Sequence, residues 1–273
     1  MPFRPRALPW LFPFCLSAAG AASPAPAPAP APAPTAPARV ILVGDSTLAS
    51  STGYGDALCA RFTPQTACIN LARGGRSSGS FRAEGRWNEV LALLRAGAEF
   101  RTTWVLIQFG HNDQPGKPGR STDYVHEFPA NMRRYVEETR AAGAVPVLIT
   151  PLTRRSFRGR WVHDDLAPWA GAVRQVARAS GAALVDLHAL SLAGVQAMGP
   201  ARAGLLARAG ANFDRTHVGP AGAERYAAMV AARLRRDVPG ISPALAPALA
   251  PTLAPALAPA LATPLPPANA SAQ

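Results

Sequence analysis

Five short apolar runs alternate with segments of helical periodicity through the middle of the chain. The apolar runs occupy residues 39–44, 66–71, 103–109, 144–150 and 182–187. Because these runs are apolar throughout rather than at every second position, they predict strands that are buried on both faces. Candidate helices lie between them, so the pattern predicts a parallel sheet with helices packed on both of its faces.

Three of the helical segments have a clear apolar face. In each, apolar residues recur every three or four positions, which places them on one side of a helix. These faces comprise Phe128, Met132, Tyr135, Val136 and Thr139; Leu166, Trp169, Val173 and Val176; and Ala223, Tyr226, Ala227, Val230 and Leu234. We expect Asp164 or Asp165 to cap the second of these helices at its N-terminus.

Both ends of the chain differ in composition from this alternating region. Residues 1–22 combine two early arginines, a short apolar stretch and small residues, which is typical of a secretory signal. Residues 23–38 alternate Ala and Pro and predict an extended linker. A Pro-Ala-Leu-Ala repeat over 241–273 predicts a disordered tail, because proline at every fourth position prevents a helix. The folded domain is therefore expected at 39–240.

The charge is strongly basic, with 28 Lys and Arg against 16 Asp and Glu and a formal net charge of +12. Either a bias towards arginine or attraction to a polyanion such as an anionic glycan explains this excess. No segment resembles a groove-reading helix or an RNA-stacking motif, so we expect no nucleic-acid partner. No later segment is long and apolar enough to cross a bilayer, and we expect an exported protein, periplasmic or extracellular, without a membrane anchor.

Two cysteines, Cys59 and Cys68, lie beyond the expected signal segment. In an oxidising compartment they suggest one disulfide that closes a short loop. Two buried, reduced thiols explain the pair nearly as well. Neither cysteine lies near the candidate chemistry along the sequence.

Polar motifs stand where a parallel α/β sheet places its site, beyond the carboxyl ends of strands. Gly-Asp-Ser at 44–46 follows the first apolar run, and Gly-His-Asn-Asp at 110–113 follows the third. A third motif, Asp-Arg-Thr-His at 214–217, precedes the last helical segment. Glycines at 74 and 75 follow the second apolar run. We expect these four segments to meet at one edge of the sheet.

The motifs together supply the groups that acyl transfer requires. Ser46 offers a nucleophile, and His217 offers a base that Asp214, three residues upstream, can orient. The side-chain amide of Asn112 and the backbone amides of Gly75 and Ser46 can form an oxyanion hole. Taken singly, each residue has an ordinary structural explanation, such as a helix cap, a tight turn or a surface histidine.

The remaining polar residues support weaker assignments. We expect His111 and His188 to be structural, whereas Trp161, His163 and Arg76 are candidates for substrate contact. Arg73, Arg76, Arg154 and Arg155 can attract carboxylates of a galacturonate chain, or form a solvated basic surface with local hydrogen bonds. No spacing of ligating residues suggests a metal cage, so we expect neither a metal nor a cofactor.

The joint pattern resembles the SGNH, or GDSL-type, hydrolase superfamily over residues 39 to about 237, its four letters falling on Ser46, Gly75, Asn112 and His217. More narrowly, the motifs at 44–47, 75–78, 109–114, 150–157, 185–191 and 214–217 resemble those of rhamnogalacturonan acetylesterases. The resemblance implies a flavodoxin-like three-layer α/β/α fold with five parallel strands. It implies Ser46 as nucleophile, His217 as base and Asp214 as its orienting group.

The resemblance thus implies an exported serine esterase, expected to be a monomer, that removes acetyl groups from pectic polysaccharide through an acyl-enzyme. Three alternatives keep the chemistry: a general or lipase-like carboxylesterase, an acetylxylan esterase, or a transferase that passes acetyl to another glycan. A different class of protein is also open, a catalytically idle glycan-binding module on a tether. The segment 159–165 matches no motif of the family, so substrate choice is not fixed by the resemblance.

Overall fold

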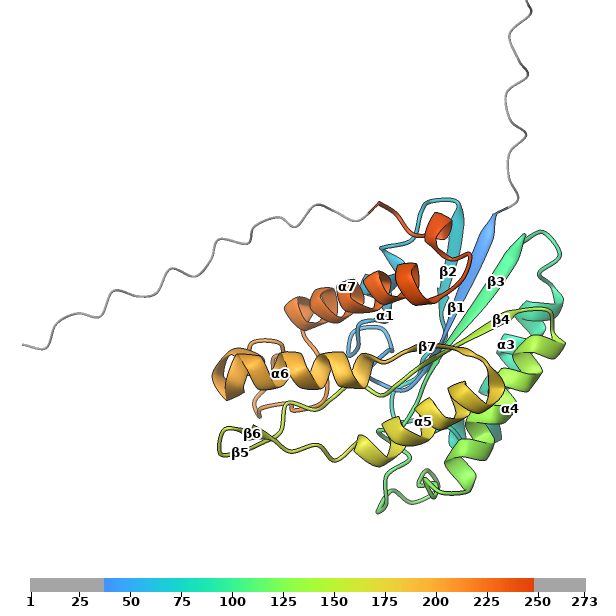
Figure 1. Cartoon of the computed structure of the whole chain (residues 1–273). Coiled ribbons are helices and arrows are strands. Elements are labelled where there is room, and N and C mark those ends of the chain that lie inside the picture. Colours follow the sequence, from blue (N-terminus) through green and yellow to red (C-terminus); the bar gives the residue numbers. More distant parts are fainter. Residues whose placement is uncertain (1–36, 248–273) are drawn as a thin grey trace, which may run out of the picture. The chain divides into compact units, whose positions relative to one another are not determined.

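A computed structural model of the chain describes residues 37–247. Its centre is a five-stranded parallel sheet (Figure 1), which confirms the predicted fold class. The strands are β1 (Ala38–Gly44), β2 (Thr66–Asn70), β3 (Thr102–Gln108), β4 (Val145–Ile149) and β7 (Ala183–Val185). Their order, β2-β1-β3-β4-β7, is that of flavodoxin-like folds.

Helices cover the sheet on both faces, because successive side chains of each strand point to opposite sides. In β1, Val40 and Leu42 pack on one side, whereas Ile41 and Val43 pack on the other. The first side is covered by α1 (Gly55–Cys59) and α7 (Pro220–Asp237), and the second by α3 (Arg86–Arg95), α4 (Glu127–Ala141) and α5 (Ala167–Ser180). The predicted three-layer arrangement is therefore confirmed.

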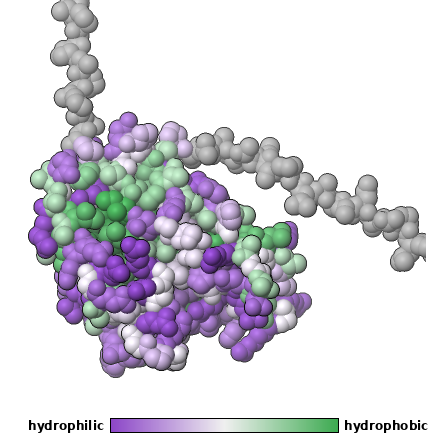
Figure 2. Space-filling model, turned by 180° about the vertical axis from the view of Figure 1, so that it is seen from behind, coloured by the Kyte–Doolittle hydropathy of each residue, from purple (hydrophilic) through white to green (hydrophobic). Residues whose placement is uncertain are grey.

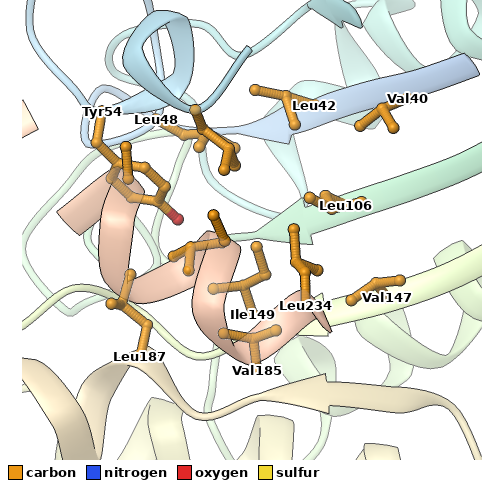
Figure 3. Close-up of a cluster of buried hydrophobic side chains, with 14 of the residues drawn as sticks. Val40, Leu42, Leu48, Tyr54, Leu106, Val147, Ile149, Val185, Leu187 and Leu234 are labelled. Atoms are coloured by element: carbon orange, nitrogen blue, oxygen red, sulfur yellow. The ribbon is translucent and has the colours of Figure 1, made fainter. Parts of the chain in front are cut away.

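The core beneath α7 joins this late helix to the strands. Figure 3 shows Leu42, Leu106 and Ile149, from β1, β3 and β4, gathered with Leu234 of α7. All four side chains are fully buried. Burial of each aliphatic side chain of this size contributes about 1.5–3 kcal/mol to the stability of the fold. This contact therefore holds the last helix firmly on the sheet.

Smaller elements complete the domain. They are α2 (Ser80–Ala83), a hairpin of β5 (Phe157–Arg158) and β6 (Trp161–Val162), α6 (Leu187–Gly204) and the 3-10 turn η1 (Ser242–Ala244). Helix α6 is kinked, since Gly199 has φ +70° and Pro200 follows it. The hairpin has only two residues in each strand, too few to give a periodic signal in the sequence.

The start of α5 differs from the prediction. Leu166 is the residue that precedes the helix, and no side chain caps it. The Asp164 carboxylate accepts from the Leu166 amide at 3.2 Å, just outside the helix, while Asp165 pairs with Arg154 at 2.7 Å. The predicted cap is thus wrong because both carboxylates are engaged by partners outside the helix.

The packed domain also extends beyond residue 240. Ile241 and Leu245 are buried in the core, and Leu245 forms a bridge with Phe62. The proline repeat hid these contacts, since isolated apolar residues between prolines have no helical or strand period. Residues up to Leu245 therefore belong to the packed domain, although the predicted tail included them. Residues 248–273, the signal segment 1–22 and the linker up to 36 lie outside the described residues.

The structure joins Cys59 at the end of α1 to Cys68 in β2 through a disulfide. No helix within residues 37–247 has the length and apolarity that a membrane span needs. The face of the molecule in Figure 2 is mostly hydrophilic, with its apolar residues gathered in patches.

Candidate active site

Loops that follow the first three strands meet at the carboxyl edge of the sheet. Gly44 and Gln108, the last residues of β1 and β3, are paired in register, so the loops that carry Ser46 and Asn112 leave neighbouring strands at the same edge. The Arg73 amide donates to the Gly44 carbonyl at 2.9 Å, which brings the glycine turn after β2 to the same edge. The parallel pairing of the strands thus brings together motifs that are far apart in the sequence.

A hydrogen-bonded chain links Ser46, His217 and Asp214. Ser46 Oγ lies 2.9 Å from His217 Nε2, and His217 Nδ1 lies 2.8 Å from Asp214 Oδ2. Because a carboxylate accepts hydrogen bonds, Nδ1 carries the proton and Nε2 is free to accept from the serine hydroxyl. The three predicted catalytic residues are therefore arranged as a nucleophile, a base and an orienting carboxylate.

The Asp214 carboxylate is kept ionised by its own loop. Its Oδ1 accepts from the backbone amides of Thr216 and His217, each at 2.9 Å. Partial burial opposes ionisation, but these amides and the His217 imidazole outweigh it and hold the pKa of Asp214 below its usual range. The loop before α7 thus fixes both the charge and the direction of the group that orients His217.

Arg155 anchors this loop from beneath. Its guanidinium donates to the carbonyl of Asp214 at 2.9 Å and to that of His217 at 2.5 Å. The residue is buried, so Arg155 neither belongs to a solvated basic surface nor lies open to substrate carboxylates, and of the two readings only its local hydrogen bonds remain. Burial lowers the pKa of its guanidinium, yet the two carbonyls keep it fixed beneath the triad. Its long-range partners gave no signal in the local sequence.

A buried polar network supports the Ser46 turn. Asp45 Oδ1 accepts from the amide and hydroxyl of Thr47 at 2.9 and 2.8 Å, and Asp45 Oδ2 lies 3.3 Å from His111 Nδ1. Burial opposes ionisation of Asp45, but His111 and Thr47 hold its pKa below the usual range. The network continues through Gln108 to Tyr54. His111 is therefore structural, as predicted.

Two of the predicted oxyanion donors, Gly75 and Asn112, belong to the glycine turn after β2 and to the loop after β3. Gly75 has φ +80°, a conformation that favours glycine, and a side chain added at Gly74 would lie 3.7 Å from the Ser46 Cβ. Asn112 Nδ2 donates to the Arg76 carbonyl at 3.1 Å, which ties the asparagine to the glycine turn. An amide nitrogen carries two hydrogens, so one remains for a substrate oxyanion.

Asp113, next to Asn112, is a buried anchor that the sequence did not single out. Its carboxylate accepts from the amide and hydroxyl of Ser78 and from the Thr122 hydroxyl, at 2.6–3.2 Å. Burial raises the pKa of Asp113 to about 6, partly offset by these hydrogen bonds. Asp113 thereby holds the loop after β3 against the glycine turn.

The three predicted substrate contacts lie in two different places. Arg76, in the glycine turn, bonds to Glu84 and to the Gly74 carbonyl, each at 2.8 Å. Trp161 lies on the β5–β6 hairpin and is 60% exposed, with the Arg160 guanidinium over its ring. The His163 amide, at the base of the hairpin, donates to the carbonyl of Ser156 at 2.8 Å.

An open cavity of about 600 Å³ lies beside the triad. Its walls come from Arg154, Ser156 and Asp165 and from the segment 212–217. Ser156 thus connects this cavity to the hairpin that carries Trp161. Within the described part of the chain, no group of three or more His, Cys, Asp or Glu side chains is placed to hold a metal ion.

Comparison with known sequences agrees with this geometry. The sequence model of the GDSL-like Lipase/Acylhydrolase family matches residues 42–225. The chain belongs to this family. The probable rhamnogalacturonan acetylesterase YesY of Bacillus subtilis (strain 168) is 30% identical to this GDSL-like hydrolase, over 72% of the chain and 92% of the relative. Rhamnogalacturonan acetylesterase RhgT of the same organism is 33% identical, over 60% and 71% respectively.

Solved structures are similar to this GDSL-like hydrolase in fold. YxiM of Bacillus subtilis superposes with a TM-score of 0.62 at 24% identity, over 73% of this chain and 56% of that one. A variant of the acetyl xylan esterase Axe2 of Geobacillus stearothermophilus has a TM-score of 0.56 at 20% identity, over 73% and 95%. These similarities confirm the predicted SGNH hydrolase fold.

Proposed function

We propose that this hydrolase is an exported serine esterase that removes acetyl groups from a polysaccharide, most specifically pectic rhamnogalacturonan, through an acyl-enzyme. The observation that carries the proposal is the hydrogen-bonded chain from Ser46 through His217 to Asp214. Its three members have the geometry that nucleophilic acyl transfer needs. The names of the relatives YesY and RhgT support the choice of substrate.

In the first step His217 Nε2 takes the hydroxyl proton of Ser46, and Oγ attacks the acetyl carbonyl carbon. The carbonyl oxygen becomes an oxyanion, to which the Asn112 side chain and the amides of Gly75 and Ser46 donate. As the tetrahedral intermediate collapses, the bond to the sugar oxygen breaks, and His217 returns the proton to that oxygen. Acetyl remains on Ser46, and the deacetylated sugar leaves.

Water resolves the acyl-enzyme by the same route in reverse. His217 takes a proton from water, hydroxide attacks the acetyl carbon, and the proton passes to Ser46 Oγ as acetate departs. Asp214 stays ionised throughout and stabilises the imidazolium that forms in each half-reaction.

The setting of the triad favours a glycan over a lipid substrate. The cavity beside His217 is open and has polar and charged walls, including Arg154, Arg215 and Asp165. A long acyl chain would find few apolar side chains there, whereas a sugar polymer can lie across an open surface. On this proposal Trp161 stacks on a sugar, while His163 and Arg76 border the polymer. Export and a monomeric state remain predictions.

A comparison of Ser46→Ala with the parent tests the proposal. With 4-nitrophenyl acetate, we expect the variant to lose about 10⁴-fold or more of kcat, because the nucleophile is absent. Acetate release should be highest from acetylated rhamnogalacturonan within a panel that includes acetylxylan and esters of longer acids. Equal rates for the two proteins would instead favour the idle glycan-binding module, and preference for longer acyl chains a lipase-like enzyme.

A further inference from the structure

The chain contains a single lysine, Lys117, and every other basic residue among its 28 is an arginine. This lysine stands five positions after Asn112, in the loop that follows β3. Its Nζ lies 3.5 Å from Asn112 Oδ1, a long contact between an ammonium and the acceptor end of the side-chain amide. The one lysine of the chain therefore lies next to a predicted oxyanion donor.

The backbone around Lys117 is fixed by hydrogen bonds within the loop. The Lys117 amide donates to Ser121 Oγ at 2.9 Å, and that hydroxyl donates to the Gln114 carbonyl at 2.8 Å. Thr122 closes the loop on the buried Asp113, through its amide and its hydroxyl, each at 2.8 Å. The backbone from which the Lys117 side chain extends is therefore held by a closed loop.

An ammonium at this position favours one of the two orientations of the Asn112 side-chain amide. A half-turn of the amide would exchange its oxygen and nitrogen with almost no change of shape. Lys117 can only donate, so it favours Oδ1 as its neighbour. With Oδ1 so placed, Nδ2 reaches the Arg76 carbonyl at 3.1 Å and keeps its second hydrogen for an oxyanion. The reversed amide would set donor against donor at Lys117 and acceptor against acceptor at Arg76.

The same loop also reaches the glycine turn. Arg120 donates to the Gly75 carbonyl at 3.3 Å, so one loop contacts both residues that are predicted to bind the oxyanion from outside the Ser46 turn. The pKa of Lys117 is lowered by partial burial and by Arg154 and Arg120, against the opposing charges of Asp45 and Asp113. Burial and the two guanidinium groups thus oppose the charged form of Lys117, whereas the carboxylates of Asp45 and Asp113 favour it.

We propose that Lys117 is a positioning residue of the oxyanion hole, which holds the Asn112 amide in the orientation that presents an N–H to the reacting carbonyl. The inference rests on the proposed esterase function and deepens it. Lys117 acts through Asn112 and does not itself contact the reacting atoms. Its removal therefore lowers the rate of the chemical step without weakening the binding of a small neutral ester.

The first test compares Lys117→Met with the parent on 4-nitrophenyl acetate, a neutral substrate. We expect kcat to fall about tenfold to a hundredfold with KM changed less than about twofold, since the lost contact matters only in the transition state. Arg101→Met is the matched control, because it removes one exposed cation at the opposite end of the sheet, next to the start of β3. This control should keep the parental kcat.

A chemical rescue separates positioning from folding. Lys117→Cys, treated with 2-bromoethylamine, forms a thioether that carries an ammonium at almost the same distance from the backbone as lysine. The disulfide keeps Cys59 and Cys68 from reacting, and the third cysteine, Cys15, lies in the expected signal segment, where the treated parent controls for its alkylation. We expect alkylation to restore most of the lost kcat in Lys117→Cys and none in Lys117→Met, with the parent treated in parallel.

Three results would overturn the inference. The first is a parental kcat for Lys117→Met on 4-nitrophenyl acetate. The second is a Lys117→Cys protein whose low kcat does not recover on alkylation. The third is a Lys117→Met protein whose only change is a higher KM for anionic pectin, which would make Lys117 a contact for substrate carboxylates. All three are distinct from failure of the esterase proposal, in which Ser46→Ala would itself keep the parental rate.

Discussion

Two histidine–aspartate pairs in this domain have almost the same distance between imidazole and carboxylate but differ in the partner of the second ring nitrogen. His217 lies 2.8 Å from Asp214, and His188 lies 2.9 Å from Asp164. A carboxylate next to an imidazole is therefore not what marks the base. The second ring nitrogen makes the difference, and it faces a hydroxyl in one pair and a guanidinium in the other.

The surroundings of His188 fix its second ring nitrogen, Nδ1, as a hydrogen-bond acceptor. Arg174 lies 3.3 Å from His188 Nδ1 and can only donate, so this nitrogen accepts and the other donates to Asp164. The ring is 3% exposed at the start of α6, and its amide bonds to the Thr150 hydroxyl at 2.8 Å. His217 instead leaves Nε2 open to Ser46 in a partly exposed loop. One pair fastens two segments together, and the other is arranged to move a proton.

The largest contrast is expected when each histidine is replaced by alanine. His217→Ala should lose about 10⁴-fold or more in kcat, because no base then accepts the Ser46 proton. His188→Ala should keep kcat within a few-fold but lose about 2–3 kcal/mol of unfolding free energy, since Asp164 loses its buried partner. Kinetics with 4-nitrophenyl acetate and urea titrations measure both. A His188→Ala protein that folds normally yet loses as much kcat as His217→Ala would contradict the distinction between a structural and a catalytic histidine.

A smaller contrast is expected at the carboxylates. Asp214→Asn should lower kcat about 10³- to 10⁴-fold, because an amide can stabilise the wrong tautomer of His217 and no longer balances the imidazolium. In Asp164→Asn the amide oxygen still accepts from His188, so kcat should change less than about tenfold. Parallel kcat measurements decide the point, and a similar loss in both variants would contradict it.

The smallest effect is expected at the guanidinium that distinguishes the second pair. Arg174 holds Asp186 with two hydrogen bonds of 2.8 and 2.9 Å besides facing His188. Arg174→Met should lower the unfolding free energy by about 1–2 kcal/mol and leave kcat unchanged. The loss of stability is small because a partly exposed ion pair contributes little to the free energy of unfolding. Thermal unfolding with the kinetic assay tests this expectation. A clear fall in kcat would link His188 to the reaction after all.

The sequence predicted what depends on local pattern. Continuous apolar runs identified all five strands of the sheet, and the motifs that follow strand ends led to the expectation that Ser46 and Asn112 lie at its carboxyl edge. Contacts that join distant segments were not predictable, because no local period records them. Arg155 reads as one of many surface arginines, yet it lies buried beneath Asp214 and His217. The same holds for Leu245, whose packing against Phe62 lies within a proline repeat.

The nucleophile and its base are 171 positions apart, one after the first strand and the other before the last helix. A chain cut short before Asp214 keeps the hydroxyl but lacks both the imidazole and the carboxylate next to it. On the proposed mechanism, such a chain cannot cleave an ester, because nothing accepts the proton of Ser46. Turnover thus requires that nearly the whole domain has been synthesised and that its last loop has reached the edge of the sheet.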